Sequence, residues 1–166
     1  MQDANIQDDR EKIEIFLSCR SLKANDVFSH PNHQVIMYTK NSAGNWSEYG
    51  KTEAIPETMN PNFVKTFVVD YIFEMQQHVK FQLSHVGHSH DGGSVETTIG
   101  AIVGAKNQTL VLELKDDKGD ARGKIVFRCD KAQNSSETAF VKLRVRKVAN
   151  QRFFLFSSSP FLRFFK

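Results

Sequence analysis

The sequence lacks the features that would carry a chain into or across a membrane. It has no uncharged apolar run of about 18 residues, which is the shortest length that reads as a transmembrane helix. Its opening stretch, MQDANIQDDREK, is polar and acidic and contains no apolar segment of the kind found in secretory signals. We therefore expect a cytoplasmic protein.

Cysteine and catalytic motifs are also scarce. The two cysteines, Cys19 and Cys129, lie far apart and form no CxxC pair, so two reduced thiols are expected in the cytosol. Serine, histidine and aspartate occur together near residues 84–91, but no nucleophile elbow, phosphate loop or HExxH motif organises them. We predict that the chain is not an enzyme.

The charge balance is mildly basic. The net charge is +3 and the isoelectric point is near 8.9, which is too mild to indicate a nucleic-acid partner. The clustered basic and aromatic groove that single-stranded nucleic acids require is also missing. A local basic face that meets anionic phospholipid remains compatible with this composition.

The 166 residues are enough for one domain with a core, and the pattern within them is that of short strands. Apolar and polar residues alternate in runs separated by Gly, Asn, Asp and Pro, which indicates an antiparallel β-sandwich. The stretch VETTIGAIVGA predicts either a helical turn or a further strand, FEMQQHV a tight connection and DDKGDARG a hairpin loop. The alternating runs are KIEIFLSC, HQVIMYTK, NFVKTFVVDY, HVKFQLSHV, QTLVLELKDD and GKIVFRCD.

The stretch LSHVGHSHDGG concentrates half of the six histidines of the chain. His85, His88 and His90 could meet Asp26 or Asp91, and three nitrogens with one oxygen suit Zn²⁺. No CxxC or HExxH spacing supports zinc, so a solvated loop without metal is the favoured interpretation. A further hypothesis is that these histidines become charged below about pH 6.5 and attract anionic lipid.

Residues 51–83 carry a denser motif. The stretch KTEAIPETMNPNFVKTFVVDYIFEMQQHVKFQL resembles the first C2 domain of copines, whose pattern contains TE, NP.F, DY.FE and Q.L.F.L at the same spacing. The flanking stretches IEIFLSCRSLKANDVFSHPNHQVIMYTK, TTIGAIVG and GKIVFRCD resemble the same domain. The residues that match are Thr52, Glu53, Asn60, Pro61, Phe63, Phe67, Asp70, Tyr71, Phe73, Glu74, Gln77 and Phe81.

The resemblance implies an all-β fold, an eight-stranded antiparallel C2-type β-sandwich over residues 11–131 that follows a polar tail at 1–10. Residues 132–166 are then a linker and the incomplete start of a second C2 domain, forming a short extension of one or two strands. The von Willebrand A-like domain of copines is absent from the sequence. A truncated family member, a splice form and an incomplete gene model are all open interpretations.

Copine C2 domains imply calcium-dependent phospholipid binding, but this chain departs from their calcium ligands. Asp26 matches the first aspartate of the family pattern, and Asn32 replaces the second. The motif YDVD becomes SHVG, so His85 and Gly87 replace two more aspartates, and Asp91 lies near a further ligand position. Calcium prefers six to eight oxygens, so these degenerate positions predict weak or lost calcium binding.

A second basic feature follows the predicted domain. In FVKLRVRKV, Lys142, Arg144 and Arg146 share one face of a predicted strand and could contact anionic lipid, with Phe161 in the aromatic tail beyond them. We expect a phospholipid-binding module at the inner face of the plasma membrane. The alternative is a calcium-independent C2 adaptor that binds a protein partner.

Overall fold

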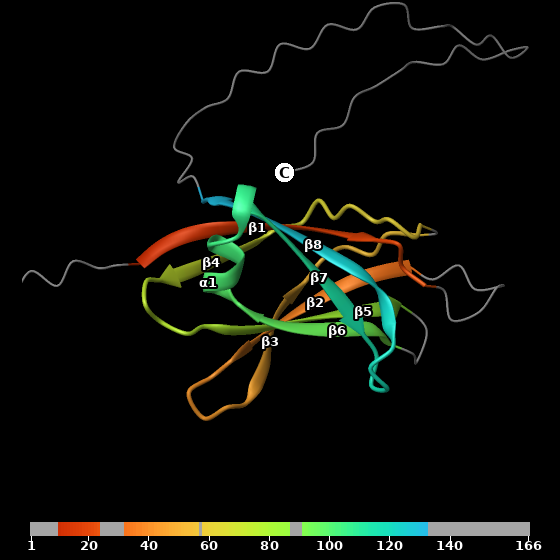
Figure 1. Cartoon of the computed structure of the whole chain (residues 1–166), viewed down its shortest axis with the longest axis horizontal. Helices are drawn as coiled ribbons and strands as arrows, with labels where there is room; N and C mark the ends of the chain where they lie inside the picture. The colour runs from red at the N-terminus through yellow and green to blue at the C-terminus, as the bar shows by residue number, and fades with distance from the viewer. Residues whose placement is uncertain (1–9, 24–31, 57, 87–90, 133–166) are drawn as a thin grey trace, which may run out of the picture. The chain divides into compact units, whose positions relative to one another are not determined.

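Figure 1 shows a computed structural model of the chain, which describes residues 10–23, 32–56, 58–86 and 91–132. Within these ranges the chain forms eight strands, one short α-helix and one 3-10 turn. No helix in this part of the chain is long and apolar enough to cross a bilayer. The elements are β1 (Arg10–Arg20), β2 (Asn32–Lys40), β3 (Trp46–Lys51), β4 (Phe67–Ile72), β5 (His78–Val86), β6 (Asp91–Thr98), α1 (Ile99–Val103), η1 (Lys106–Gln108), β7 (Thr109–Lys115) and β8 (Ala121–Lys131).

The strands pair antiparallel in the order β3-β2-β5-β6-β7-β8-β1-β4. The sheet folds over at the β6–β7 junction, where Ser94 with Lys115 is the paired position. Its two end strands, β3 and β4, approach each other because the Tyr49 hydroxyl donates a hydrogen bond to the backbone oxygen of Val68. The predicted eight-stranded antiparallel sandwich is therefore confirmed.

The alternation seen in the sequence fills the interior of the sandwich. On β1 the alternate residues Ile13, Ile15 and Leu17 are buried, as period-two strands with one face in a core require. The aromatic rings of Phe81 and Phe127 pack edge to face with centroids 4.8 Å apart, a favoured geometry for aromatic pairs.

The three predicted connections have identifiable local causes. VETTIGAIVGA contains the end of β6 and then α1, because the Thr98 hydroxyl caps the helix by accepting from the Ala101 backbone at 3.1 Å. FEMQQHV begins with a tight turn in which the Met75 amide donates to the Ile72 carbonyl. DDKGDARG is the β7–β8 hairpin turn, closed by a bond from the Gly119 amide to the Asp116 carbonyl.

Residues 133–166 lie outside the described residues. The predicted extension after residue 132 therefore stays a prediction.

Candidate functional site at the loop end of the sandwich

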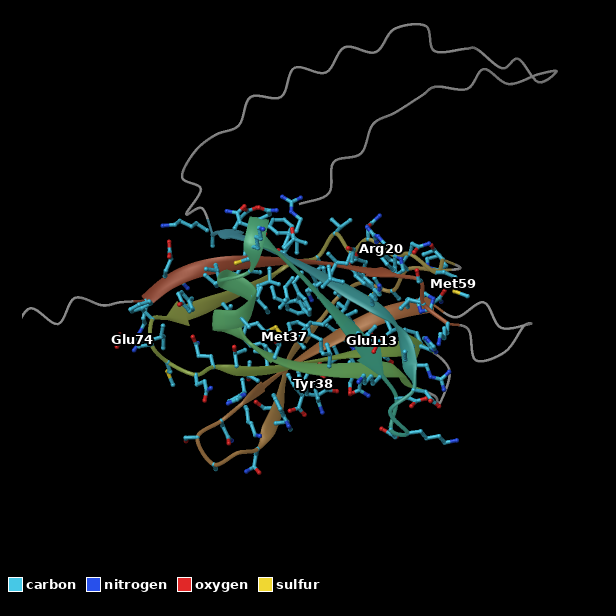
Figure 2. All side chains as sticks on the ribbon, in the orientation of Figure 1. Arg20, Met37, Tyr38, Met59, Glu74 and Glu113 are labelled. Carbon is cyan, nitrogen blue, oxygen red and sulfur yellow. The ribbon has the colours of Figure 1, made fainter. Side chains whose placement is uncertain are left out.

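One end of the sandwich gathers the strand ends that the resemblance assigns to calcium and lipid. We call it the loop end: the carboxyl ends of β1, β5 and β7 and the amino ends of β2, β6 and β8, which the antiparallel pairing brings together. Figure 2 places Arg20 and Met59 at this end and Glu74 at the opposite end.

The segment between β3 and β4 is anchored to the loop end by polar contacts. The Leu22 amide donates to the Met59 carbonyl at 3.0 Å, and the Ser21 amide donates to the Asn60 side chain at 2.9 Å. Thr52 is 3% exposed, and its hydroxyl accepts from the Val35 amide at 3.0 Å. Motif residues such as Thr52 and Asn60 therefore build the frame of the site.

Two buried histidines face each other inside this frame. His33 on β2 and His85 on β5 are directly paired positions, and their side chains are 2% and 4% exposed. Their ring centroids lie 5.0 Å apart, with the ring planes at 69°. Both project to the inner face of the sandwich, in phase with the buried residues Val35 and Leu83.

The surroundings keep His33 neutral at physiological pH. Burial lowers the pKa of His33 from 6.5 to about 4, and the neighbouring His85 acts in the same direction. A hydrogen bond to the Thr58 backbone acts in the opposite direction and is too weak to offset the burial. Burial and the proximity of His85 therefore both favour an imidazole over an imidazolium at this position.

The four predicted calcium positions are not brought together by the part of the chain that the structure describes. Asp26 lies outside it, and Asn32 is exposed at the start of β2, opposite Val86. His85 points into the sandwich, and Asp91 begins β6 opposite Ser84, with its side chain outside the described part. Across residues 10–23, 32–56, 58–86 and 91–132, no three His, Cys, Asp or Glu side chains gather as metal ligands. The degenerate calcium site stays a prediction.

Sequence reasoning missed His33. Its signal was present, because the alternation in HQVIMYTK puts His33 in phase with the apolar residues Val35 and Met37. That pattern predicts a buried histidine. The partner across the sheet depends on the β2–β5 register, which joins residues some fifty positions apart.

The loop end also carries exposed cations and apolar side chains. The Arg20 guanidinium donates to the Cys19 carbonyl and to the Asn62 side-chain oxygen, at 2.6 and 2.8 Å, so neutral acceptors hold it. Lys124 on β8 is the register partner of Arg20. Met59 and Val86 are 42% and 45% exposed at the same end. The predicted lipid contacts Lys142, Arg144, Arg146 and Phe161 lie outside the described residues.

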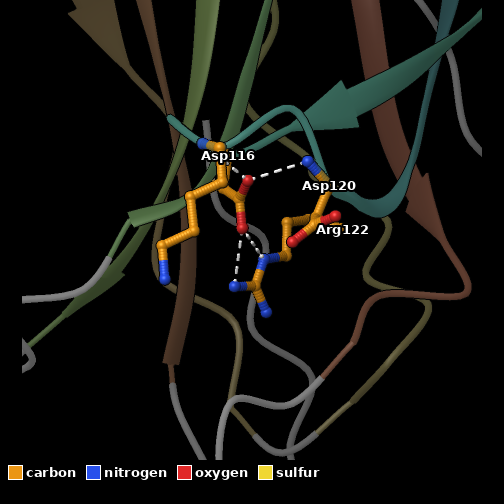
Figure 3. A network of polar contacts seen from close by, with 4 residues as sticks. Asp116, Asp120 and Arg122 are labelled. Atoms are coloured by element: carbon orange, nitrogen blue, oxygen red, sulfur yellow. Dashed lines mark hydrogen bonds and ion pairs between the residues drawn. The ribbon is translucent and has the colours of Figure 1, made fainter.

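Asp116 follows β7 at the loop end, and its carboxylate makes its contacts within the β7–β8 hairpin (Figure 3). Its carboxylate accepts the backbone amides of Lys118 and Asp120 at 3.0 and 2.9 Å and forms an ion pair with Arg122 at 2.7 Å. Desolvation raises the pKa of Asp116, but the hydrogen bonds and Arg122 outweigh it, so the pKa lies below its usual value. We assign this carboxylate a structural role in the turn.

A second group of cations lies on the outer face of β2, β3 and β5. The Lys80 ammonium sits 4.8 Å from the Tyr38 ring centre, and Lys40 sits 5.2 Å from that of Trp46. Glu96 is the register partner of Lys80, and Glu48 that of Tyr38. Acidic residues therefore interleave with the cations on this face.

Comparison with known proteins agrees with this architecture. The C2 domain family model matches residues 13–114. Copine-E of Dictyostelium discoideum is 32% identical over 166 residues, covering 93% of this chain and 28% of that protein. Copine-A of the same organism is 27% identical over 160 residues, covering 95% of this chain and 27% of that protein.

Solved structures show the same fold. A C2 domain of plant extended synaptotagmin 1 superposes with a TM-score of 0.56 at 16% identity, covering 72% of this chain and 92% of that one. The structure named BON1-C2B superposes with a TM-score of 0.55 at 16% identity, covering 78% and 96%.

The chain therefore belongs to the C2 domain family, and its curated relatives place this C2 domain among the copines. It spans just over a quarter of the length of those two copines.

Proposed function

We propose that the chain is a copine-type C2 module that docks onto anionic phospholipid membranes with weak or no dependence on calcium. It acts as a binding module and not as an enzyme, peripheral to the inner face of the plasma membrane. The observation that supports weak or lost calcium dependence is the burial of His85. At a position where the copine pattern has an aspartate, this chain has a buried imidazole packed against His33.

Calcium chemistry supports this proposal. Ca²⁺ takes six to eight oxygen ligands, and imidazole nitrogen is a poor substitute for carboxylate. With His85 turned into the sandwich, the oxygen donors left from the family pattern are Asp26, Asn32 and Asp91. Two carboxylates and one amide offset the dehydration of Ca²⁺ poorly, so cytosolic calcium would leave the site empty.

Charge at the loop end supports lipid docking without calcium. Arg20, Lys23 and Lys124 are exposed there, beside the partly exposed apolar side chains of Met59 and Val86. Basic residues near an anionic surface contribute about 1 kcal/mol each, and apolar side chains at their edge enter the headgroup region. The predicted contacts Lys142, Arg144, Arg146 and Phe161 would add to the same attraction.

The test is cosedimentation of the full chain with liposomes of graded anionic content, in chelator, at low and high salt. We expect binding to rise with the anionic fraction, to be negligible on neutral liposomes and to weaken as salt rises. Binding that ignores both lipid charge and salt would contradict the proposal.

One observation favours a protein partner as a second candidate. Phe73 and Met75 are 62% and 57% exposed on the turn between β4 and β5, at the end opposite the loop end. Exposed aromatic and methionine side chains are enriched in protein interfaces. If the chain binds no liposomes under any condition, the calcium-independent adaptor becomes the better description.

A further inference from the structure

We propose that two copies of the chain pair through the exposed edge of β3, and that the resulting dimer holds two anionic membranes together. The pairing is antiparallel, edge to edge, and centred on Ser47. The dimer is argued from the described residues alone. Its action on membranes rests on the proposed function, because that action requires docking through the loop end.

The edge of β3 is open at its amino end. β3 stands last in the sheet order, so β2 is its one paired neighbour among the described strands. The Asn41 amide donates to the Asn45 carbonyl at 2.9 Å, which sets the phase of the β2–β3 ladder. Because an antiparallel ladder alternates, Ser47 bonds to β2, whereas the N–H and C=O groups of Trp46 and Glu48 point away from it. Such outward groups form a template for a further strand.

Side chains cover the other parts of the two sheet edges. The Gln77 side chain bonds to the backbone of β4, and the Tyr49 hydroxyl crosses from β3 to the Val68 carbonyl. Neither contact reaches the amino half of β3. The extra residue in the β2–β3 register lies after Glu48, so residues 46–48 keep a regular ladder. The β2–β3 hairpin that contains them extends away from the rest of the sandwich (Figure 1).

The side chains at this edge are complementary to themselves. In the proposed register, Trp46 of one copy lies opposite Glu48 of the other, and the two Ser47 residues face each other. The Lys40 and Lys80 ammonium groups lie 5.2 and 5.5 Å from the Trp46 ring centre, so each Glu48 meets a cationic surface on the second copy. A register with Glu48 opposite Glu48 would bring like charges together. The charge pattern therefore favours a two-fold axis at Ser47.

The interface is small. Two Trp46–Glu48 pairs exchange about four backbone hydrogen bonds. Interfaces that bury less than about 1,200 Å² are typical of weak, transient association, so the dimer should dissociate readily in dilute solution. Membranes that gather the chain at their surfaces raise its effective concentration and favour pairing.

The direction of the strands decides how the dimer presents its loop ends. β2 begins at the loop end, and β3 runs back toward it. Antiparallel pairing of two identical strands reverses one copy relative to the other, so the two loop ends point in opposite directions. The paired residues lie beside the β2–β3 turn, at the far end from the loop end. A dimer built in this way offers one basic loop end to each of two membranes.

Disulfide trapping of the full chain tests the pairing. In the proposed register two cysteines at position 47 have Cα atoms about 4.5 Å apart, within the range that a disulfide spans. In a glutathione redox buffer, Ser47→Cys should form a disulfide-linked dimer at least tenfold faster than Thr109→Cys, an exposed control on β7. The native Cys19 and Cys129 are buried and should not compete. Equal rates for the two variants would overturn the proposal.

A charge reversal tests the register. Adding Glu48→Lys to the Ser47→Cys chain should slow trapping at least tenfold, because each new lysine faces Lys40 and Lys80 of the second copy. Glu96→Lys makes the same charge change at an exposed position on the same sheet face, two strands from the edge, and should leave the rate unchanged. Equal effects of the two reversals would overturn the proposed register.

Liposomes of phosphatidylserine and phosphatidylcholine test the action on membranes, with cosedimentation for binding and light scattering for clustering. The trapped Ser47→Cys dimer should cluster them at a concentration at least tenfold lower than Thr109→Cys. Selective trapping without any liposome binding would contradict the proposed function and leave the dimer standing. Liposome binding without selective trapping would do the reverse. A trapped dimer that binds liposomes but does not cluster them would overturn the opposed arrangement of the loop ends.

Discussion

At the scale of single residues, the loop end differs from the copine pattern in the residues that stand where that pattern has aspartates. His85 stands at a position where the copine pattern has an aspartate, and its side chain lies on the inner face of β5, where it meets His33. The replacement at residue 85 could be recognised from the sequence, because this chain has SHVG where the copine motif is YDVD. The burial of the pair could not, because it depends on the register of two strands far apart in the chain.

The lowered pKa of His33 predicts that the fold is sensitive to acid. The unfolded chain binds a proton at this histidine with a pKa near 6.5, and the folded chain does so only near 4. A depressed folded pKa contributes stability that is complete above pH 6.5 and is lost as the pH falls from 6.5 to 4. The shift corresponds to a loss of about 3 kcal/mol by the lower end of this window.

Urea unfolding in chelator at several pH values between 7.5 and 4 measures that loss. A folded His33→Gln variant should show a shallower fall in unfolding free energy than the parent chain, while His78→Gln should follow the parent. Identical curves for the parent and His33→Gln would show that His33 does not carry the effect.

At the scale of elements, most strands could be predicted, but β3 (Trp46–Lys51) matched no alternating run and β4 begins at Phe67, later than the run NFVKTFVVDY indicates. The side-chain hydrogen bonds that protect the sheet edges could not be predicted. Alternation fixed the extent of β1 and β5, and Gly, Asn and Asp marked the turns. The stretch VETTIGAIVGA stayed ambiguous because it contains both a strand end and a helix, and the Thr98 cap decides where one becomes the other. Side chains that protect a sheet edge leave no periodic signal.

The outer edge of β4 carries side-chain hydrogen bonds of this kind. The Gln77 side chain accepts from the Ile72 amide at 2.9 Å and donates to the Asp70 carbonyl at 2.7 Å, and Tyr49 covers the Val68 carbonyl. Open strand edges recruit other strands, so these side chains protect the sheet against edge-to-edge association.

Gln77→Ala should therefore destabilise the fold by about 1–2 kcal/mol and promote self-association. Chemical denaturation and light scattering measure the two effects. Gln76→Ala, at the exposed neighbouring position, is the matched control and should change neither. Equal stability and equal self-association of the two variants would show that Gln77 does not protect the edge of β4.

At the scale of the whole molecule, the copine resemblance predicted the fold and the family from one dense motif. The structure adds which charges reach the loop end. Arg20 and Lys124 pair across β1 and β8 at that end, whereas Lys106 and Arg128 lie toward the opposite end of β7 and β8. Net charge alone could not make this distinction, since it assigns no position to any residue.

Reversing the charges of Arg20 and Lys124 tests whether the loop end is the surface that docks onto the membrane. Arg20→Glu with Lys124→Glu should weaken binding to anionic liposomes by at least tenfold in chelator, given about 1 kcal/mol for each basic residue at the surface. Lys106→Glu with Arg128→Glu makes the same change in net charge and should have a much smaller effect. Equal losses in the two double variants would show that docking follows overall charge and not the loop end.

The most direct test of the central claim is cosedimentation of the unmodified chain with anionic liposomes, once in calcium at cytosolic signalling concentrations and once in chelator. We predict equal binding in the two conditions, because the proposed site has the buried His85 in place of an aspartate and would then keep too few oxygen ligands for Ca²⁺. Binding in calcium that disappears in chelator would show a working calcium site and would contradict the account.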